Sequence, residues 1–185
     1  MLPPVSDAQH DDPEYRIQPR YWVDAGLTHE VLSEDAATTW FFCWRDVGPS
    51  ERTFVGTILP RTAIGHVAPI LFATLPARLR CALSAVLCSL MVDYAARQKS
   101  SRMTFFVIEQ LPIITPTVLA EQISWLGSTP EDWLSIRVLE LCYTNEELVP
   151  FAADLGRHHP PFRWRPDRRV LLQAEMTLPS CIFMD

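Results

Sequence analysis

Lysine, asparagine and glycine are scarce in this sequence. Of its 16 cationic residues only Lys99 is a lysine, Asn145 is the single asparagine, and six glycines are spread over 185 residues. Nucleotide-binding loops cradle phosphates with closely spaced glycines and, in the Walker type, a lysine that follows them. No Gly-x-x-x-x-Gly-Lys string and no Gly-x-Gly-x-x-Gly string occurs. The scarcity therefore excludes the common phosphate-binding loops.

Other catalytic motifs are also missing. There is no Gly-x-Ser-x-Gly elbow for a serine hydrolase. Arg97 stands two residues before the only lysine, where the usual magnesium-dependent nuclease needs an acid. The string His159-Pro160-Pro161-Phe162 resembles an amino-methyltransferase motif, but histidine lacks the side-chain carbonyl that accepts hydrogen bonds from the target amine. We interpret that string as a turn, and we expect no catalytic residue in this chain.

Cysteines do not predict a disulfide framework. Their number is odd, no Cys-x-x-Cys pair occurs, and each lies in an apolar stretch, which is typical of buried, reduced thiols in a cytoplasmic protein. His158 and His159 are adjacent, so their side chains diverge, and we expect no metal site. The five cysteines are Cys43, Cys81, Cys88, Cys142 and Cys181.

Size and charge limit the class of protein further. With 185 residues and 48% hydrophobic residues the chain is long enough for one domain with its own core. The net charge of −6 excludes a wholly basic nucleic-acid coat protein but allows a local basic patch. Residues 1–15 contain no apolar run, so we expect no signal peptide. Polar residues interrupt the apolar stretch 79–96, so we expect no membrane span and a cytoplasmic protein.

The pattern of apolar residues predicts an α+β fold, a small antiparallel or mixed sheet packed by helices. Residues 1–19 are rich in proline and aspartate and are predicted to be a mobile lead-in to a domain over 20–175. We expect one long helix near 76–98, because its apolar positions recur at helical spacing after Pro76. Strands are predicted at 21–23, 38–47, 52–59, 68–74 and 104–109, and further helices from Thr129, at 146–155 and at 166–175.

Two segments concentrate positive charge. Residues 97–102, Arg-Gln-Lys-Ser-Ser-Arg, follow the long helix and combine cations, hydroxyls and an amide, the groups that contact phosphates and base edges. The alternative is a solvated helix C-terminus, where the helix dipole favours cations. Residues 157–169 carry five arginines, and the alternative there is a surface turn with arginines stacked on Phe162 and Trp164. A loop with Arg61, Gly65 and His66 is a third candidate, where the glycine indicates a tight turn or close approach to a partner.

A series of short motifs follows one another along this sequence in a characteristic order. It resembles the C-terminal target-recognition region of the large adenine-specific DNA methyltransferases of phage-defence systems, the BREX and DISARM type, which are related to type IIG restriction–modification enzymes. The resemblance covers residues 20–175. The motifs are Tyr21-Trp22-Val23, Trp44-Arg45-Asp46-Val47, Glu51-Arg52-Thr53, Pro60-Arg61, Gly65-His66, and the segments 93–99, 109–113, 137–144, 151–156 and 160–169.

This resemblance implies recognition of double-stranded DNA without methyl transfer. In that family an upstream domain binds S-adenosylmethionine and carries the Asn-Pro-Pro-aromatic motif, and neither feature occurs in this chain. The resemblance therefore implies that the chain alone is not an enzyme, holds no cofactor, and could pair with a separate methyltransferase catalytic chain. The residues it favours for DNA contact are Arg61, His66, Arg97, Gln98, Lys99 and Arg102.

Two alternatives stay open: a module that docks on a separate catalytic subunit without binding DNA, and a non-functional truncated remnant. Residues 176–185 favour truncation, because they depart from the family pattern and Pro179 should break the last helix. Allowed codons for this tail, read from their third nucleotide, give Asp-Ala-Ala-Phe-Val-His-Leu-Tyr-Gly, which restores that pattern. The tail is therefore predicted to be frame-shifted and poorly packed.

Overall fold

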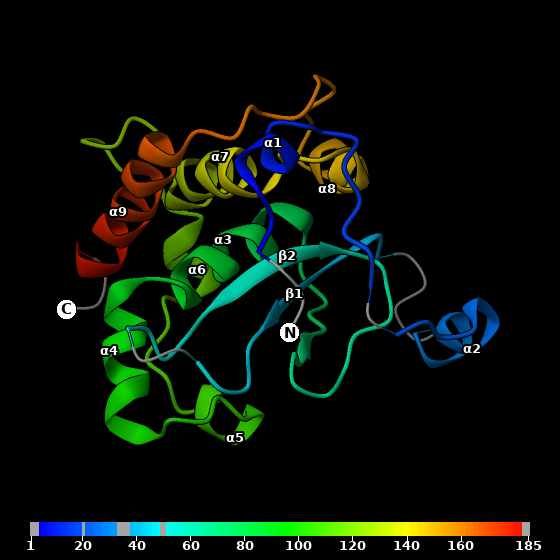
Figure 1. Cartoon of the computed structure of the whole chain (residues 1–185). Helices are drawn as coiled ribbons and strands as arrows, with labels where there is room; N and C mark the ends of the chain where they lie inside the picture. Colours follow the sequence, from blue (N-terminus) through cyan, green and yellow to red (C-terminus); the bar gives the residue numbers. More distant parts are fainter. Residues whose placement is uncertain (1–3, 20, 33–37, 49–50, 183–185) are drawn as a thin grey trace.

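A small antiparallel sheet lies at the centre of the molecule (Figure 1). The computed structural model describes residues 4–19, 21–32, 38–48 and 51–182. Within these ranges the sheet has the order β2-β1-β3, with β1 at Trp40–Trp44, β2 at Gly56–Pro60 and β3 at Ile70–Leu71. Phe42 of β1 lies opposite Ile58 of β2 and Leu71 of β3. The α+β prediction is confirmed, with the strands shorter than expected.

The central strand β1 is buried on both faces, so every one of its residues is apolar. Trp40, Phe42 and Trp44 point into the main core, where helices pack against them. Phe41 points to the other face and packs edge to face on Phe72, with 5.5 Å between ring centroids. Aromatic side chains therefore pack on both faces of β1, against the helices on one face and against the chain just after β3 on the other.

The single long helix predicted near 76–98 is wrong. The structure has two helices, α3 at Ala77–Leu87 and α4 at Leu90–Lys99, bent by 60°. Ser89 is extended, and its hydroxyl accepts a hydrogen bond from the Val92 N–H at 3.3 Å, so it caps a new helix. Among the described residues no single helix is long and apolar enough to cross a membrane, and α3 and α4 meet that test only as this bent pair.

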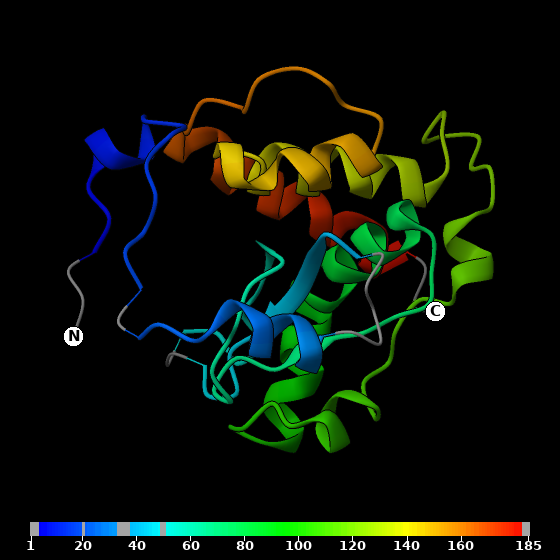
Figure 2. The same cartoon turned by 90° about the vertical axis from the view of Figure 1, so that its right-hand side faces the viewer.

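Most of the helices that follow residue 115 pack over the sheet on the side away from α5 (Phe105–Ile108), and the last of them also contacts α4 (Figures 1 and 2). The elements are α6 (Pro116–Leu119), α7 (Pro130–Cys142), the 3-10 helix η2 (Glu146–Leu148), α8 (Val149–Asp154) and α9 (Pro166–Ile182). Thr129 caps α7 as predicted, since its hydroxyl accepts from the Asp132 N–H at 3.1 Å. Gly156 follows α8 with a φ of +81°, which a residue with a side chain rarely adopts.

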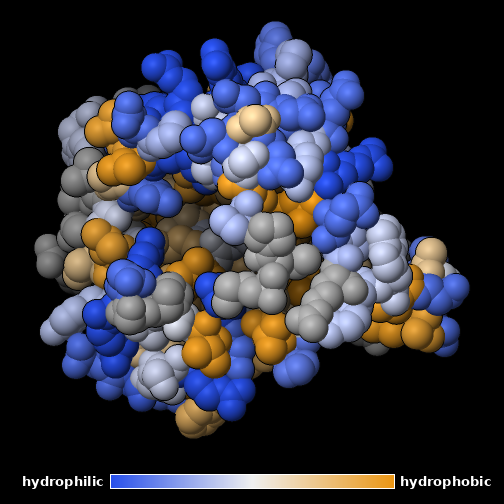
Figure 3. All heavy atoms as spheres, viewed as in Figure 1, coloured by the Kyte–Doolittle hydropathy of each residue, from blue (hydrophilic) through white to orange (hydrophobic). Residues whose placement is uncertain are grey.

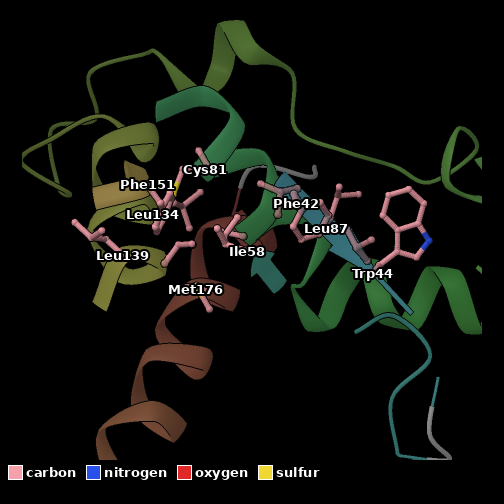
Figure 4. Packing of buried hydrophobic residues seen from close by; sticks show 14 of the residues in the cluster. Phe42, Trp44, Ile58, Cys81, Leu87, Leu134, Leu139, Phe151 and Met176 are labelled. Carbon is pink, nitrogen blue, oxygen red and sulfur yellow. The ribbon is translucent and has the colours of Figure 1, made fainter. Parts of the chain in front are cut away.

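The sequence predicts that the last helix ends at Glu175, but the helix continues past Pro179 to Ile182. A proline inside a helix removes one backbone donor, and here that loss does not end the helix. Met176 is only 5% exposed and lies in the core cluster with Ile58 and Leu139 (Figure 4). The expectation of poor packing is therefore wrong at Met176, whereas the shifted reading frame stays a prediction about the coding DNA.

Two predicted strands are also wrong. Residues 21–23 form no strand and precede the short helix α2 (Ala25–Val31). Residues 104–109 form the helix α5 (Phe105–Ile108), which Thr104 precedes in an extended conformation. A four-residue apolar run fits either structure, and packing against the rest of the fold decides between them.

The N-terminal segment lies along the second half of the chain. It contains the short helix α1 (Asp7–His10), and the His10 ring stacks on Trp164 at 3.8 Å. Asn145 donates from its side chain to the Tyr15 carbonyl at 2.5 Å, and the Glu146 N–H donates to the Pro13 carbonyl at 2.9 Å. These two hydrogen bonds join residues 13–15 to the start of η2. The mobility of residues 1–19 stays a prediction.

Buried thiols agree with the expected reduced cysteines. Cys43, Cys81, Cys88 and Cys142 are all free, and the side chain of Cys181 lies outside the described part of the structure. Burial raises the pKa of Cys43 to about 11 and that of Cys88 to about 12. These thiols are therefore protonated at neutral pH and behave as small apolar side chains.

Candidate nucleic-acid interface

Two of the predicted DNA-contacting segments meet at the end of strand β1. The Asp46 N–H donates to the Val67 carbonyl at 3.0 Å, and the Met103 N–H donates to the Asp46 carbonyl at 2.7 Å. Asp46 thus holds the loop that carries His66 on one side and the segment that carries Arg102 on the other. His66 and Phe105 line one apolar cavity of about 490 Å³, which places α5 beside the same loop.

Arg102 is anchored by the carboxylate of Asp46. Its Nε lies 3.2 Å from Asp46 Oδ2, and Nη2 contacts the same oxygen. This hydrogen bond, together with the negative charge of Asp46, raises the pKa of Arg102. The arginine side chain is still 64% exposed, whereas the aspartate side chain is only 10% exposed. The pair therefore presents the outer edge of a fixed guanidinium to solvent.

Arg97 makes hydrogen bonds within the protein as well as an ion pair. Its Nη2 donates to the Glu51 carbonyl at 2.7 Å, and its Nε donates to the Thr53 hydroxyl at 3.3 Å. Its guanidinium also lies 3.9 Å from the Asp93 carboxylate, and about half of the side chain is exposed. Arg97 thus ties α4 to the segment before β2, which leaves only part of its hydrogen-bonding capacity for a ligand.

Asp93 organises this region, a role that sequence reasoning missed. The side chain is buried, and one carboxylate oxygen accepts hydrogen bonds from the Thr53 N–H at 2.8 Å and the Phe54 N–H at 2.6 Å. Arg52 lies 3.9 Å from the same oxygen and donates to the Cys88 carbonyl at 2.6 Å. An aspartate among the apolar positions of a predicted helix was the available signal, because a buried acid needs partners.

Gln98 and Lys99 lie at the C-terminal end of α4. Both are exposed, and the ammonium of Lys99 lies 3.4 Å from the Gln110 side-chain oxygen. The end of a helix carries partial negative charge from its last carbonyls, which favours cations at this place. Lys99 can leave the weak contact with Gln110 and reach a phosphate without breaking a structural bond.

Arg61 does not join the other five predicted residues. It follows β2 at the end of the sheet opposite Asp46, since its N–H donates to the Thr39 carbonyl. Its guanidinium donates to the carbonyls of Thr38 at 2.9 Å and Leu32 at 2.6 Å. These bonds give Arg61 a structural role in joining the chain around β1 and β2.

The second arginine-rich segment forms internal stacks. Arg157 lies 3.8 Å from the Phe162 ring centroid and Arg169 lies 3.6 Å from that of Trp164. The alternative of a surface turn with stacked arginines is confirmed for these two pairs. Arg168 is paired with Glu140 at 2.8 Å, so it joins α9 to α7.

We call the surface around the C-terminal end of α4 and the neighbouring α5 the α4–α5 surface. Its members are His66, Arg97, Gln98, Lys99, Arg102, Phe105, Phe106 and Gln110. In the described part of the chain no three His, Cys, Asp or Glu side chains lie close enough to hold a metal ion.

Comparisons with protein-family models, with curated proteins and with solved structures found no match. The structure therefore defines an α+β domain with a three-stranded antiparallel sheet, in which Arg97 and Arg102 of the α4–α5 surface are each paired with a buried aspartate.

Proposed function

We propose that this chain is a cytoplasmic DNA-recognition fragment of a phage-defence adenine-specific DNA methyltransferase and lacks the catalytic and S-adenosylmethionine-binding domain. The observation that carries the proposal is the α4–α5 surface, where Gln98 and Lys99 are exposed beside the anchored guanidiniums of Arg97 and Arg102. Cations of this kind position a protein on phosphates, and a nearby amide can read a base edge. The family resemblance supplies the biological context of the proposal.

In this proposal, the residues of the α4–α5 surface make different contacts with the DNA. Lys99, whose contacts within the protein are weak, pairs with a backbone phosphate. Arg102 presents the outer edge of its guanidinium to a second phosphate, held in place by Asp46. Gln98 reads an adenine through two hydrogen bonds, as glutamine side chains can in the major groove. The negative charge elsewhere on the protein limits binding to this one face.

Replacing Lys99 with alanine is expected to weaken binding to duplex DNA and to lower the slope of log affinity against log salt by about one unit. The variant loses one contact with a phosphate, so its binding releases one counterion fewer from the DNA. Fluorescence anisotropy with a labelled duplex at several salt concentrations measures both quantities. Arg97→Ala should have a similar effect, but its structural bonds require that thermal stability be measured beside it.

Arg165→Ala is the matched control, because this exposed arginine lies at the start of the last helix, outside the α4–α5 surface. It should leave affinity and slope unchanged. Equal affinities and slopes for the wild type and Lys99→Ala would contradict the placement of DNA on this surface.

A second candidate function is a module that docks on a separate methyltransferase chain. It is favoured by the apolar residues in and before α2, where Trp22 is 79% exposed and no residue of the helix is buried. Figure 3 shows these hydrophobic side chains on the part of the molecule that projects to the right. Exposed apolar surface of this kind marks protein contacts. DNA binding by the isolated chain would favour recognition, and its absence would favour docking.

A further inference from the structure

We propose that Phe106 inserts its ring against an unstacked base of double-stranded DNA bound to the α4–α5 surface. This inference rests on the proposed function and adds the form of DNA that the surface prefers. Phe106 is 73% exposed, although a phenylalanine gains most when it is buried. Aromatic side chains at protein–DNA interfaces stack on bases or enter as wedges between base steps.

The core fixes the direction of the helix that carries Phe106. Phe105, the preceding residue, packs edge to face on Trp44, with 5.1 Å between ring centroids. Trp44 is itself fully buried, and its indole N–H donates to the Met103 carbonyl at 2.7 Å. Phe105 packs on Trp44 although half of its own side chain stays exposed, and Phe106, the next residue of the short helix α5, faces solvent. A wedge must be rigid to separate bases without losing much conformational entropy.

The Gln110 side chain connects Phe106 to Lys99, which is a proposed phosphate contact. The Gln110 side chain donates to the Phe106 carbonyl at 2.9 Å and approaches the Lys99 ammonium through its oxygen at 3.4 Å. Arg102 precedes α5 by only three residues. The exposed ring thus lies on the same surface as Lys99 and Arg102, and a partner with negative charge outside and flat apolar surfaces inside fits this combination. Duplex DNA has this chemistry, with phosphates on its rim and base faces in its stack.

The cost of unstacking gives the inference a measurable consequence. Opening a base step in a paired duplex costs a few kcal/mol, and a mismatch has already lost part of that stacking. The wild-type protein should therefore bind a duplex with one mismatch about tenfold more tightly than the fully paired duplex. The preference arises from the ring and not from the phosphates, which are the same in both duplexes.

The test compares wild type, Phe106→Ala and Phe106→Trp on the paired and the mismatched duplex by fluorescence anisotropy. Phe106→Ala should remove the preference while the salt dependence persists, and Phe106→Trp should keep it. Trp22→Ala is the matched control, an exposed aromatic on a different surface, and should keep the preference. Thermal unfolding should be nearly unchanged in all variants, since the replaced side chains are exposed.

The outcomes separate the two proposals. Salt-dependent binding of both duplexes with equal affinity, or a preference that survives in Phe106→Ala, overturns the wedge and leaves DNA recognition standing. A loss of preference in Trp22→Ala as large as in Phe106→Ala also overturns the assignment to Phe106. No binding to either duplex overturns both the wedge and the proposed function.

Discussion

Replacing Asp93 with alanine is expected to destabilise the protein by about 3–5 kcal/mol, because removal of one partner from a buried ionic cluster leaves the other groups without compensation. The Thr53 and Phe54 N–H groups lose their acceptor, and Arg52 and Arg97 lose the carboxylate between them. Urea unfolding followed by tryptophan fluorescence measures the loss as a lower midpoint.

Asp93→Asn separates the charge from the hydrogen bonds. Its side-chain oxygen can still accept from the two N–H groups but no longer neutralises the two arginines. We expect an intermediate loss of stability. A change below about 1 kcal/mol in Asp93→Ala, the range of an exposed pair, would show that the cluster does not hold the start of β2 on α4.

Trp44→Ala is expected to cost about 3–5 kcal/mol, the range for removing a large aromatic side chain from a core. Trp44 is 1% exposed and packs near Phe42 (Figure 4). Its ring also lies near Phe54 and contacts Phe105 on α5. The substitution should also weaken the preference for mismatched DNA in the fraction that stays folded, since it removes the support of Phe106. Equilibrium unfolding measures the first effect and anisotropy the second.

Trp44→Phe is the control for Trp44→Ala, because it keeps an aromatic ring in the core while it loses the hydrogen bond to Met103 and part of the indole volume. It should cost clearly less. Equal losses of stability in both variants would indicate that the hydrogen bond, and not the packing, fixes this end of the sheet.

Local signals in the sequence predicted the sheet and the helix from Thr129 but not the break inside 76–99. The apolar spacing continues through the bend, because both α3 and α4 bury one face against the same core. Ser89 was the local signal for a new helix start. The strand predicted at 104–109 is wrong for another reason, because Phe105 contacts Trp44, a residue far away in the chain. Short apolar runs take the structure that such distant contacts favour.

In the candidate site, too, the sequence predicts some features, whereas others depend on contacts with distant residues. Residues 97–102 are expected to follow a helix in an exposed loop, whereas the structure places Gln98 and Lys99 in the last turn of α4, where both are exposed. The partners of Arg61 could not be predicted, because two backbone carbonyls from a distant segment bind it. Asp46 likewise gives no signal in sequence of its pairing with Arg102, which depends on the sheet bringing the two together.

Binding of duplex DNA by the wild-type chain at increasing salt tests the central claim most directly. With two or three phosphates contacted, the account predicts a linear fall of log affinity with log salt, at a slope of about −2 to −3. Folded protein that binds no duplex at about 50 mM salt, or binds it with an affinity that salt does not change, would contradict DNA recognition by this chain.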